Sequence, residues 1–123
     1  MDRDALVAAC LAQPEAVEEF PFGDDVSVFK VVGKMFALVP MDGSLSISLK
    51  CDPDFAVSLR ERYAAVTGGY HLNKRHWNTV RVDGTIPDTE IRDWIEDSYD
   101  LVVDGLPKRV KLRLQGEVRG LDS

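Results

Sequence analysis

Residues 26–51, VSVFKVVGKMFALVPMDGSLSISLKC, decide the fold of this chain. Apolar and polar side chains alternate through much of the stretch, most regularly from Leu45 to Leu49, and this is the period of a half-buried strand. Gly33-Lys34 and Asp42-Gly43 suit two-residue hairpin turns of type II′ and type I′. The stretch therefore predicts a three-stranded antiparallel meander, with strands at residues 26–32, 35–41 and 44–51.

The two turns set the register, and the register decides which side chains share a face of the sheet. Across the first turn Val31 is expected to face Phe36, and across the second Leu38 is expected to face Ile47. One face is then apolar and carries Phe29, Val31, Phe36, Leu38, Ile47 and Leu49. The other face is predicted to carry Lys30, Ala37 and Ser48 in one row and Val32, Met35 and Lys50 in the next, which brings Lys30 and Lys50 close together.

Helical patterns flank the meander. A first helix is expected over about residues 4–13, capped by Asp2 or Asp4 and stopped by Pro14. Asp52-Pro53 is a typical helix start and predicts a second helix, because Asp can cap it and Pro fits its first position. The apolar stripe of that helix is expected to be Phe55, Ala56, Leu59 and Tyr63.

Beyond the second helix, residues 77–83 have the pattern of a further strand, and a third helix is expected from near Pro87 to Gly105. Pro107 could open a short basic helix, or the chain after it could run extended along the surface. The last few residues are expected to be mobile. Strands that are grouped in this way predict an α+β fold with a mainly antiparallel, twisted sheet packed with helices.

Size and composition indicate one soluble domain over residues 1–123. No apolar run is long enough to span a bilayer. The acidic start of the chain, Met1-Asp2-Arg3-Asp4, is followed by no signal-type apolar stretch, so we expect a cytoplasmic protein. Cys10 and Cys51 lie in apolar-periodic segments, and we expect buried free thiols.

Charge is unevenly distributed along the chain. The net charge of −6 disfavours indiscriminate binding to nucleic acid. Acids dominate residues 1–25 and 87–104, with seven acids and one base in each, whereas residues 26–82 and 105–119 each have a local charge of +4. These blocks could form a bipolar surface, or they could be solvated faces without a partner.

Residues 69–77, GYHLNKRHW, are the richest stretch in hydrogen-bonding and stacking side chains, and they contain both histidines of the protein. The histidines and the amide could contact a planar ligand, or they could satisfy backbone groups of a loop that Tyr70 and Trp77 anchor in the core. The lysines of the predicted sheet face could add an anion site, or they could be ordinary exposed lysines. The candidate binding residues are Lys30, Lys34, Lys50, His71, Asn73, Lys74, Arg75 and His76.

The chain resembles the MmcQ/YjbR-like family of small bacterial proteins over nearly its whole length. The matching pieces are Pro21-Phe22-Gly23, residues 29–37, Leu49-Lys50 with Pro53, residues 69–80, Ile86-Pro87, Ser98-Tyr99 with Leu101-Val102, and Leu106-Pro107-Lys108. The resemblance implies a compact α/β sandwich with a twisted antiparallel sheet. It also implies a DNA-binding function through a proposed "double wing" motif.

The sequence thus favours a non-enzymatic binding module that contacts DNA or another phosphate-bearing ligand through the basic sheet face and the 71–77 loop. The alternative is a protein-interaction or chaperone-like module, in which the acidic helix 87–104 and the basic tail 105–119 recruit a partner. No catalytic pattern stands out. No cofactor is expected, and His71 and His76 lack the further ligands that a metal site needs.

Overall fold

The computed structural model describes residues 1–119 of the chain. Six strands form one sheet in the order β1-β2-β3-β4-β6-β5, and every neighbouring pair is antiparallel. The strands are β1 (Val17–Glu19), β2 (Val26–Val31), β3 (Lys34–Pro40), β4 (Ser46–Lys50), β5 (Val66–Gly68) and β6 (Trp77–Arg81). The helices are α1 (Arg3–Leu11), α2 (Pro53–Arg62), α3 (Asp88–Asp104) and α4 (Lys108–Arg119). The predicted α+β class is confirmed.

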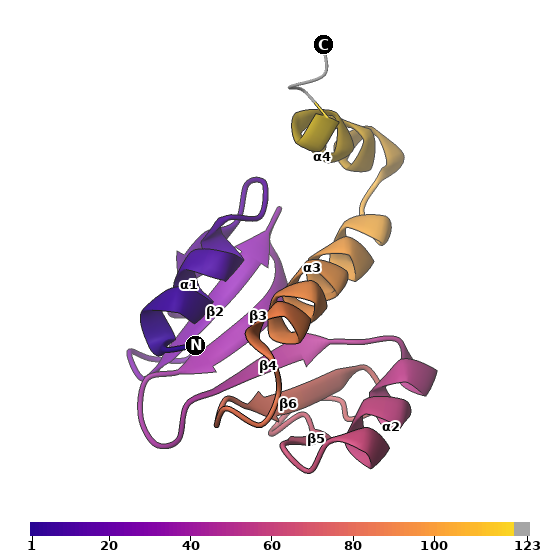
Figure 1. Ribbon diagram of the computed structural model, residues 1–123. Helices are drawn as coiled ribbons and strands as arrows, with labels where there is room; N and C mark the ends of the chain where they lie inside the picture. Colours follow the sequence, from indigo (N-terminus) through magenta and orange to yellow (C-terminus); the bar gives the residue numbers. More distant parts are fainter. Residues whose placement is uncertain (120–123) are drawn as a thin grey trace.

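The helices are distributed unequally over the sheet. Helices α1 and α3 lie on one face, which we call the covered face, and α2 lies beside β5 and β6 (Figure 1). The opposite face, which we call the open face, has no helix over it among the described residues. Helix α4 follows the end of α3 and lies across that end of the molecule (Figure 1), with its Leu114 side chain buried in the main core. Within residues 1–119, none of the helices combines the length and apolarity that crossing a membrane requires.

The expected helix ends are largely confirmed. The side chain of Asp2 accepts a hydrogen bond from the Ala5 amide at 2.8 Å, and Asp52 accepts one from the Asp54 amide at 3.0 Å. Pro87 and Gly105 are the caps of α3. Of the two alternatives for the basic stretch, the helix is the correct one, and it begins directly after Pro107. The expected mobility of the last residues concerns positions 120–123, which lie outside the described residues.

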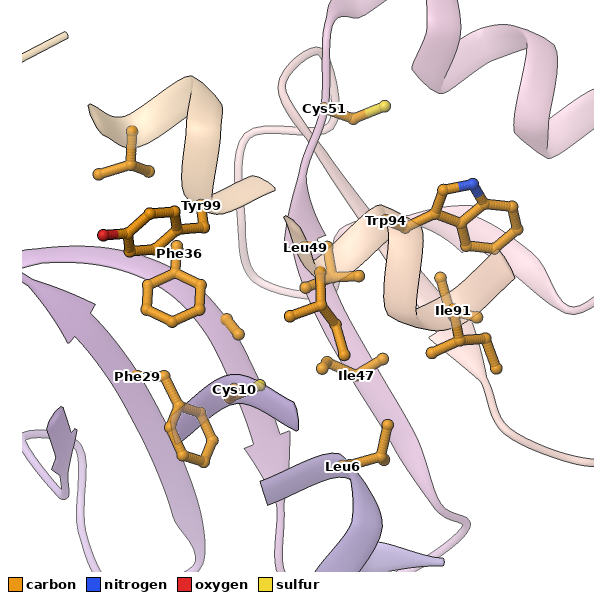
Figure 2. Close-up of a cluster of buried hydrophobic side chains, with 14 of the residues drawn as sticks. Leu6, Cys10, Phe29, Phe36, Ile47, Leu49, Cys51, Ile91, Trp94 and Tyr99 are labelled. Atoms are coloured by element: carbon orange, nitrogen blue, oxygen red, sulfur yellow. The ribbon is translucent and has the colours of Figure 1, made fainter. Parts of the chain in front are cut away.

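The main core fills the space between the covered face and helices α1 and α3 (Figure 2). Phe36 is fully buried and its ring meets the edge of Tyr99, with centroids 5.5 Å apart and planes at 89°. Trp94 is buried and packs against Tyr63. Cys10 and Cys51 are both buried and free, as expected.

The first hairpin turn differs from the prediction. Val31 pairs with Lys34, so the turn residues are Val32 and Gly33 instead of Gly33 and Lys34. Both turn residues have positive φ, 48° at Val32 and 77° at Gly33, which is a requirement of the type I′ turn. The sequence signal misled because a β-branched residue is rarely found in the left-handed region.

A β-bulge in β3 compensates for the shifted turn. Phe29 pairs with Ala37 and Lys30 pairs with Met35, so Phe36 is an extra residue without a partner on β2. As a result Phe36 and Ala37, although adjacent, both pack into the main core. The bulge explains how the predicted core positions of β2 and Phe36 are correct although the predicted register is wrong.

The bulge also reverses the second half of β3. Leu38 was expected on the apolar face with Phe29, but it pairs with Val28 and Ser48 and packs with Trp77 on the open face. Ala37 was expected beside the lysines and lies in the core instead.

The predicted common face of Lys30 and Lys50 is confirmed. Lys30 pairs with Met35 and Lys50 pairs with Trp77, and both of these partners belong to the open-face cluster.

Two further expectations are wrong, and two strands were not predicted. The Asp42-Gly43 segment is no two-residue turn, because β3 ends at Pro40 and β4 begins at Ser46. The short strands β1 and β5 were not predicted, since three residues give too little pattern to detect. Phe55 is 40% exposed instead of lying in the buried stripe of α2.

Ser98 on α3 holds the sheet together where the bulge interrupts it. Beyond Leu49, strands β3 and β4 no longer pair, so the Phe36 carbonyl and the Lys50 amide do not form a strand-to-strand hydrogen bond. The Ser98 hydroxyl, fully buried, donates to the Phe36 carbonyl at 2.6 Å and accepts from the Lys50 amide at 2.8 Å. One side chain therefore satisfies two buried backbone groups on two strands.

We expect Ser98→Ala to reduce the free energy of unfolding by about 2–4 kcal/mol, because two buried backbone groups lose their partner at once. Denaturant unfolding measures the effect. Ser44→Ala, in the exposed loop between β3 and β4, is the matched control and should change stability by less than about 0.5 kcal/mol. Equal stability of Ser98→Ala and the wild type would show that the hydroxyl is dispensable.

We expect Val32→Asn to stabilise the protein by about 1 kcal/mol, because asparagine tolerates the left-handed conformation that strains valine. Val32→Thr keeps the β-branch and should give no gain. Thermal unfolding of the two variants side by side checks this. A Val32→Asn protein no more stable than Val32→Thr would contradict the turn assignment.

Candidate functional site

The loop of residues 69–76 joins β5 to β6 and is tightly tied by backbone hydrogen bonds. The Gly69 amide donates to the Trp77 carbonyl at 2.9 Å, and the Cys51 amide donates to the His76 carbonyl at 2.7 Å. A side chain on Gly69 would collide with Trp77, at 2.7 Å from its Cβ, so this close approach requires glycine. The candidate residues of this loop therefore stand on a rigid support.

Three of the predicted loop residues take part in the local backbone structure. The Asn73 side-chain oxygen accepts from the Arg75 amide at 2.9 Å, which makes Asn73 a turn residue. His71 has a positive φ of 59° and is the third residue of a turn that the Leu72 amide closes on the Gly69 carbonyl at 3.2 Å. His76 contributes its backbone, donating to the Asn73 carbonyl at 3.1 Å.

Tyr70 and Trp77 have opposite surroundings. Trp77 is buried on the open face with Val28 and Leu38, as expected. In one of the two interpretations of the loop, Tyr70 anchors it in the core together with Trp77, but Tyr70 is 73% exposed. Its ring lies against the His71 ring, with centroids 4.0 Å apart. That interpretation is wrong for Tyr70, because sequence alone does not distinguish an aromatic side chain that packs from one that is exposed.

A groove of about 670 Å³ runs over the open face of the sheet. Its floor contains Leu38, Ser48 and Thr79, and the last two are joined by a 2.8 Å hydrogen bond between their hydroxyls. Its remaining lining residues are Phe22, Asp25, Val26, Pro40, Asp42, Ser46, Tyr70, His71 and Leu72. We call this feature the open-face groove.

Of the eight predicted binding residues, His71 alone lines the open-face groove in the part of the chain that the structure describes. Lys30 and Lys50 lie on the same sheet face, two positions along their strands from Val28 and Ser48. This spacing corresponds to about 7 Å beyond the floor of the groove. Lys30 and Lys50 therefore share the face of the groove, but most of the eight predicted residues lie outside its lining.

The predicted lysines and arginine differ in whether their side chains already have a partner within the chain. The Lys30 ammonium forms an ion pair with Glu19 on β1 at 3.1 Å. The Lys74 ammonium reaches the Gly69 carbonyl at 3.4 Å, and Arg60 donates to the Lys74 carbonyl at 2.8 Å. Lys34 and Arg75 are exposed, and Lys50 is half-buried.

Sequence reasoning missed Phe22 and Tyr70 as site residues. Phe22 is 63% exposed, and it follows Pro21 and precedes Gly23, whose φ is 112°. An aromatic between Pro and Gly is a signal for a side chain displayed on a turn. That signal could have marked Phe22 as an exposed ring, but its position opposite the 69–77 loop depends on the pairing of the sheet.

Both thiols of the chain have raised pKa values. Burial, followed by the nearby carboxylates of Asp52 and Asp97, raises the pKa of the Cys51 thiol to about 11. Burial and then Glu18 raise the pKa of Cys10 to about 12. Both thiols are therefore protonated at neutral pH and poorly nucleophilic. Within residues 1–119 there is no group of three or more His, Cys, Asp or Glu side chains arranged to hold a metal.

We expect Tyr70→Ala to change the free energy of unfolding by less than about 0.5 kcal/mol, because the ring is exposed. Trp77→Ala should lower it by about 3–5 kcal/mol, because the indole is buried in the open-face cluster. Urea unfolding of both variants tests the contrast. Similar losses for the two variants would show that Tyr70 also anchors the fold.

Comparison with known proteins places this architecture in a family. A family model described as YjbR matches residues 11–101. The chain is 41% identical over 97 residues to the uncharacterized protein YbdF of Escherichia coli O157:H7, covering 78% of this chain and 80% of YbdF. It is 35% identical over 104 residues to the uncharacterized protein YjbR of Escherichia coli strain K12, covering 84% of this chain and 88% of YjbR.

Two solved structures share the fold. The crystal structure of Deinococcus radiodurans protein DR2400, with the family-model domain DUF419, superposes with a TM-score of 0.84 at 39% identity, over 91% of this chain and 86% of that one. A crystal structure from Pseudomonas syringae superposes with a TM-score of 0.71 at 28% identity, over 82% of this chain and 98% of that one. Since the family model covers most of the chain and the identity to both curated relatives exceeds 30%, the chain belongs to the YjbR family.

Proposed function

We propose that this protein is a non-catalytic binding module that takes a planar, phosphate-bearing ligand, in the first instance single-stranded DNA, on the open face of its sheet. The observation that carries the proposal is the open-face groove with two displayed aromatic rings, Phe22 and Tyr70. Exposed aromatics beside an uncovered sheet are a common platform for nucleic-acid bases, because every base has a stacking face.

The charges around the groove favour one orientation of such a ligand. Asp25 and Asp42 line the end near Val26 and Pro40, and they repel phosphate. Arg81 also lies toward that end, but its guanidinium pairs with Asp83 at 2.9 Å. Lys50 and Lys30 lie at the opposite end of the same strands. A phosphate is therefore expected at the lysine end and a planar group between the aromatic rings.

Lys50 is the cation that we expect to contribute most. Glu19 already neutralises much of Lys30, whereas Lys50 forms no ion pair within the described residues. Lys34 does not extend this basic area, because it pairs with Val31, a core residue of the covered face. The attraction of Lys30 and Lys50 for phosphate acts locally and opposes the repulsion from the overall charge of −6.

The protein-interaction alternative has less support from the charges of the tail. Lys111 on α4 pairs with Asp104 of α3 at 2.8 Å, and Arg113 pairs with Glu15. These basic side chains therefore have partners inside the same chain. Fewer of them remain to recruit another protein.

The proposal is tested by fluorescence-anisotropy titration of labelled single- and double-stranded oligonucleotides at low salt. We expect saturable binding of the single strand. Tyr70→Ala should weaken it by about 1–3 kcal/mol through loss of stacking. Lys50→Glu should weaken it and flatten the slope of log affinity against log salt by about one unit or less.

Two control variants match these changes. Phe55→Ala removes a partly exposed aromatic outside the groove, and Lys108→Glu reverses a charge at the start of α4. Both should bind like the wild type if the groove is the site. No saturable binding by the folded wild-type protein at tens of micromolar, or equal weakening by the controls, would refute the proposal.

A further inference from the structure

A second cavity lies on the other side of the sheet, between the covered face, α2 and α3. It has a volume of about 290 Å³, at the lower end of the range for small-molecule sites. Its apolar walls come from β4, α2, β6 and α3, namely Leu49, Cys51, Phe55, Leu59, Val80, Trp94 and Leu101. Its polar lining residues are Lys50, Asp52, Asn78, Asp97, Asp100 and Asp104. We call it the α2–α3 cavity.

Asn78 gives this cavity an unmet hydrogen-bonding need. The residue is 2% exposed and lines the cavity from β6. Its amide nitrogen donates to the Ala56 carbonyl at 3.2 Å, but its side-chain oxygen is buried without a hydrogen-bond partner among the described residues. A buried acceptor without a donor is unusual and costly, so it marks a place where a bound group can donate.

The rim on α3 is acidic and only partly neutralised. Asp104 pairs with Lys111. Asp97 and Asp100 form no ion pair within residues 1–119. Burial, followed by the neighbouring carboxylates, raises the pKa of both Asp97 and Asp100. A cation placed between them would relieve this repulsion.

Lys50, the lysine among the lining residues, does not place its ammonium between Asp97 and Asp100. Alternation along β4 directs the Lys50 side chain to the open face, where Lys50 pairs with Trp77. Leu49 and Cys51, its neighbours in the chain, belong to the core on the covered side. Lys50 therefore lines the α2–α3 cavity from the main chain.

We propose that the α2–α3 cavity binds a small organic cation, a primary amine carried on an apolar or aromatic body. The body fits against Leu59, Val80 and Trp94, and the ammonium lies at Asp97 and Asp100. A further N–H or O–H of the ligand can donate to the Asn78 oxygen. The charge of the rim selects amines over carboxylates of the same shape.

This site is separate from the open-face groove, and the two tryptophans distinguish them. Trp94 lines the α2–α3 cavity, whereas Trp77 packs on the open face. The two binding proposals can therefore fail or succeed independently of each other.

The test is a titration of the ¹⁵N-labelled full chain with tryptamine, phenethylamine and hexylamine, followed by NMR. We expect saturable shifts of the Trp94 indole N–H and the Asn78 side-chain amide at about 1 mM ligand or below, with Trp77 unmoved. Indole-3-propionate and 3-phenylpropionate, the matched carboxylates, should bind at least tenfold more weakly.

Variants assign the binding to this cavity. The double change Asp97→Asn/Asp100→Asn should weaken amine binding about tenfold or more, and Leu101→Phe should weaken it by filling space. Glu96→Gln removes an exposed carboxylate of the same helix that does not line the cavity, and it should bind like the wild type.

Three results would each overturn the proposal. One is the absence of saturable binding by all three amines at about 10 mM while the spectrum shows a folded protein. Another is equal binding of amines and carboxylates. The third is unchanged affinity in the folded Asp97→Asn/Asp100→Asn variant.

Discussion

The hydroxyl of Ser98 is the constraint on which much of this molecule depends. It occupies the place where β3 and β4 separate, and it replaces the strand-to-strand hydrogen bond with two bonds of its own, to the Phe36 carbonyl and the Lys50 amide. Because β4 is released from β3 at this point, the chain can turn through Cys51 into α2. The Cys51 amide then meets the His76 carbonyl, which ties the 69–76 loop to the same position. The sheet, the second helix and the candidate loop are thus joined at one side chain of α3.

The same separation creates two different surfaces from one sheet. On the covered side, the departure of β4 leaves the α2–α3 cavity, bounded by Asn78 and the acidic rim of α3. On the open side, the strands keep their alternation and present Ser48, Thr79 and the lysines. Trp77, the first residue of β6, packs on that face with Val28 and Leu38 and holds the end of the loop that carries Tyr70. The β-bulge at Phe36 is therefore a structural device with consequences on both sides of the sheet.

Helix ends and the alternation of strands could be predicted from the sequence, whereas the pairing of residues between strands could not. Asp52-Pro53, Pro87 and Gly105 marked helix ends because capping depends on residues close in sequence. The alternation of β4 also held, and it placed Lys50 on the correct face. The bulge was invisible because Phe36 and Ala37 are both acceptable core residues, and nothing local says that one of them lacks a partner. Val32 was misassigned because tertiary pairing overrides its aversion to positive φ. Phe22 and Tyr70 come together only through the sheet, so neither revealed the groove alone.

Net charge is a poor guide to what this protein can bind, because its charges are sorted by surface. The carboxylates of Asp97 and Asp100 concentrate beside the α2–α3 cavity, where little protein cation opposes them. Lys30 and Lys50 lie on the open face, where Glu19 pairs with Lys30, while Lys50 forms no ion pair within the described chain. At physiological ionic strength, charges are largely screened beyond about 8 Å. A ligand on either face therefore responds mainly to the charges of that face. For this reason, one acidic chain can accommodate both a phosphate on the open face and an amine in the cavity. The sheet lies between the two sites and separates the lysines of one from the carboxylates of the other.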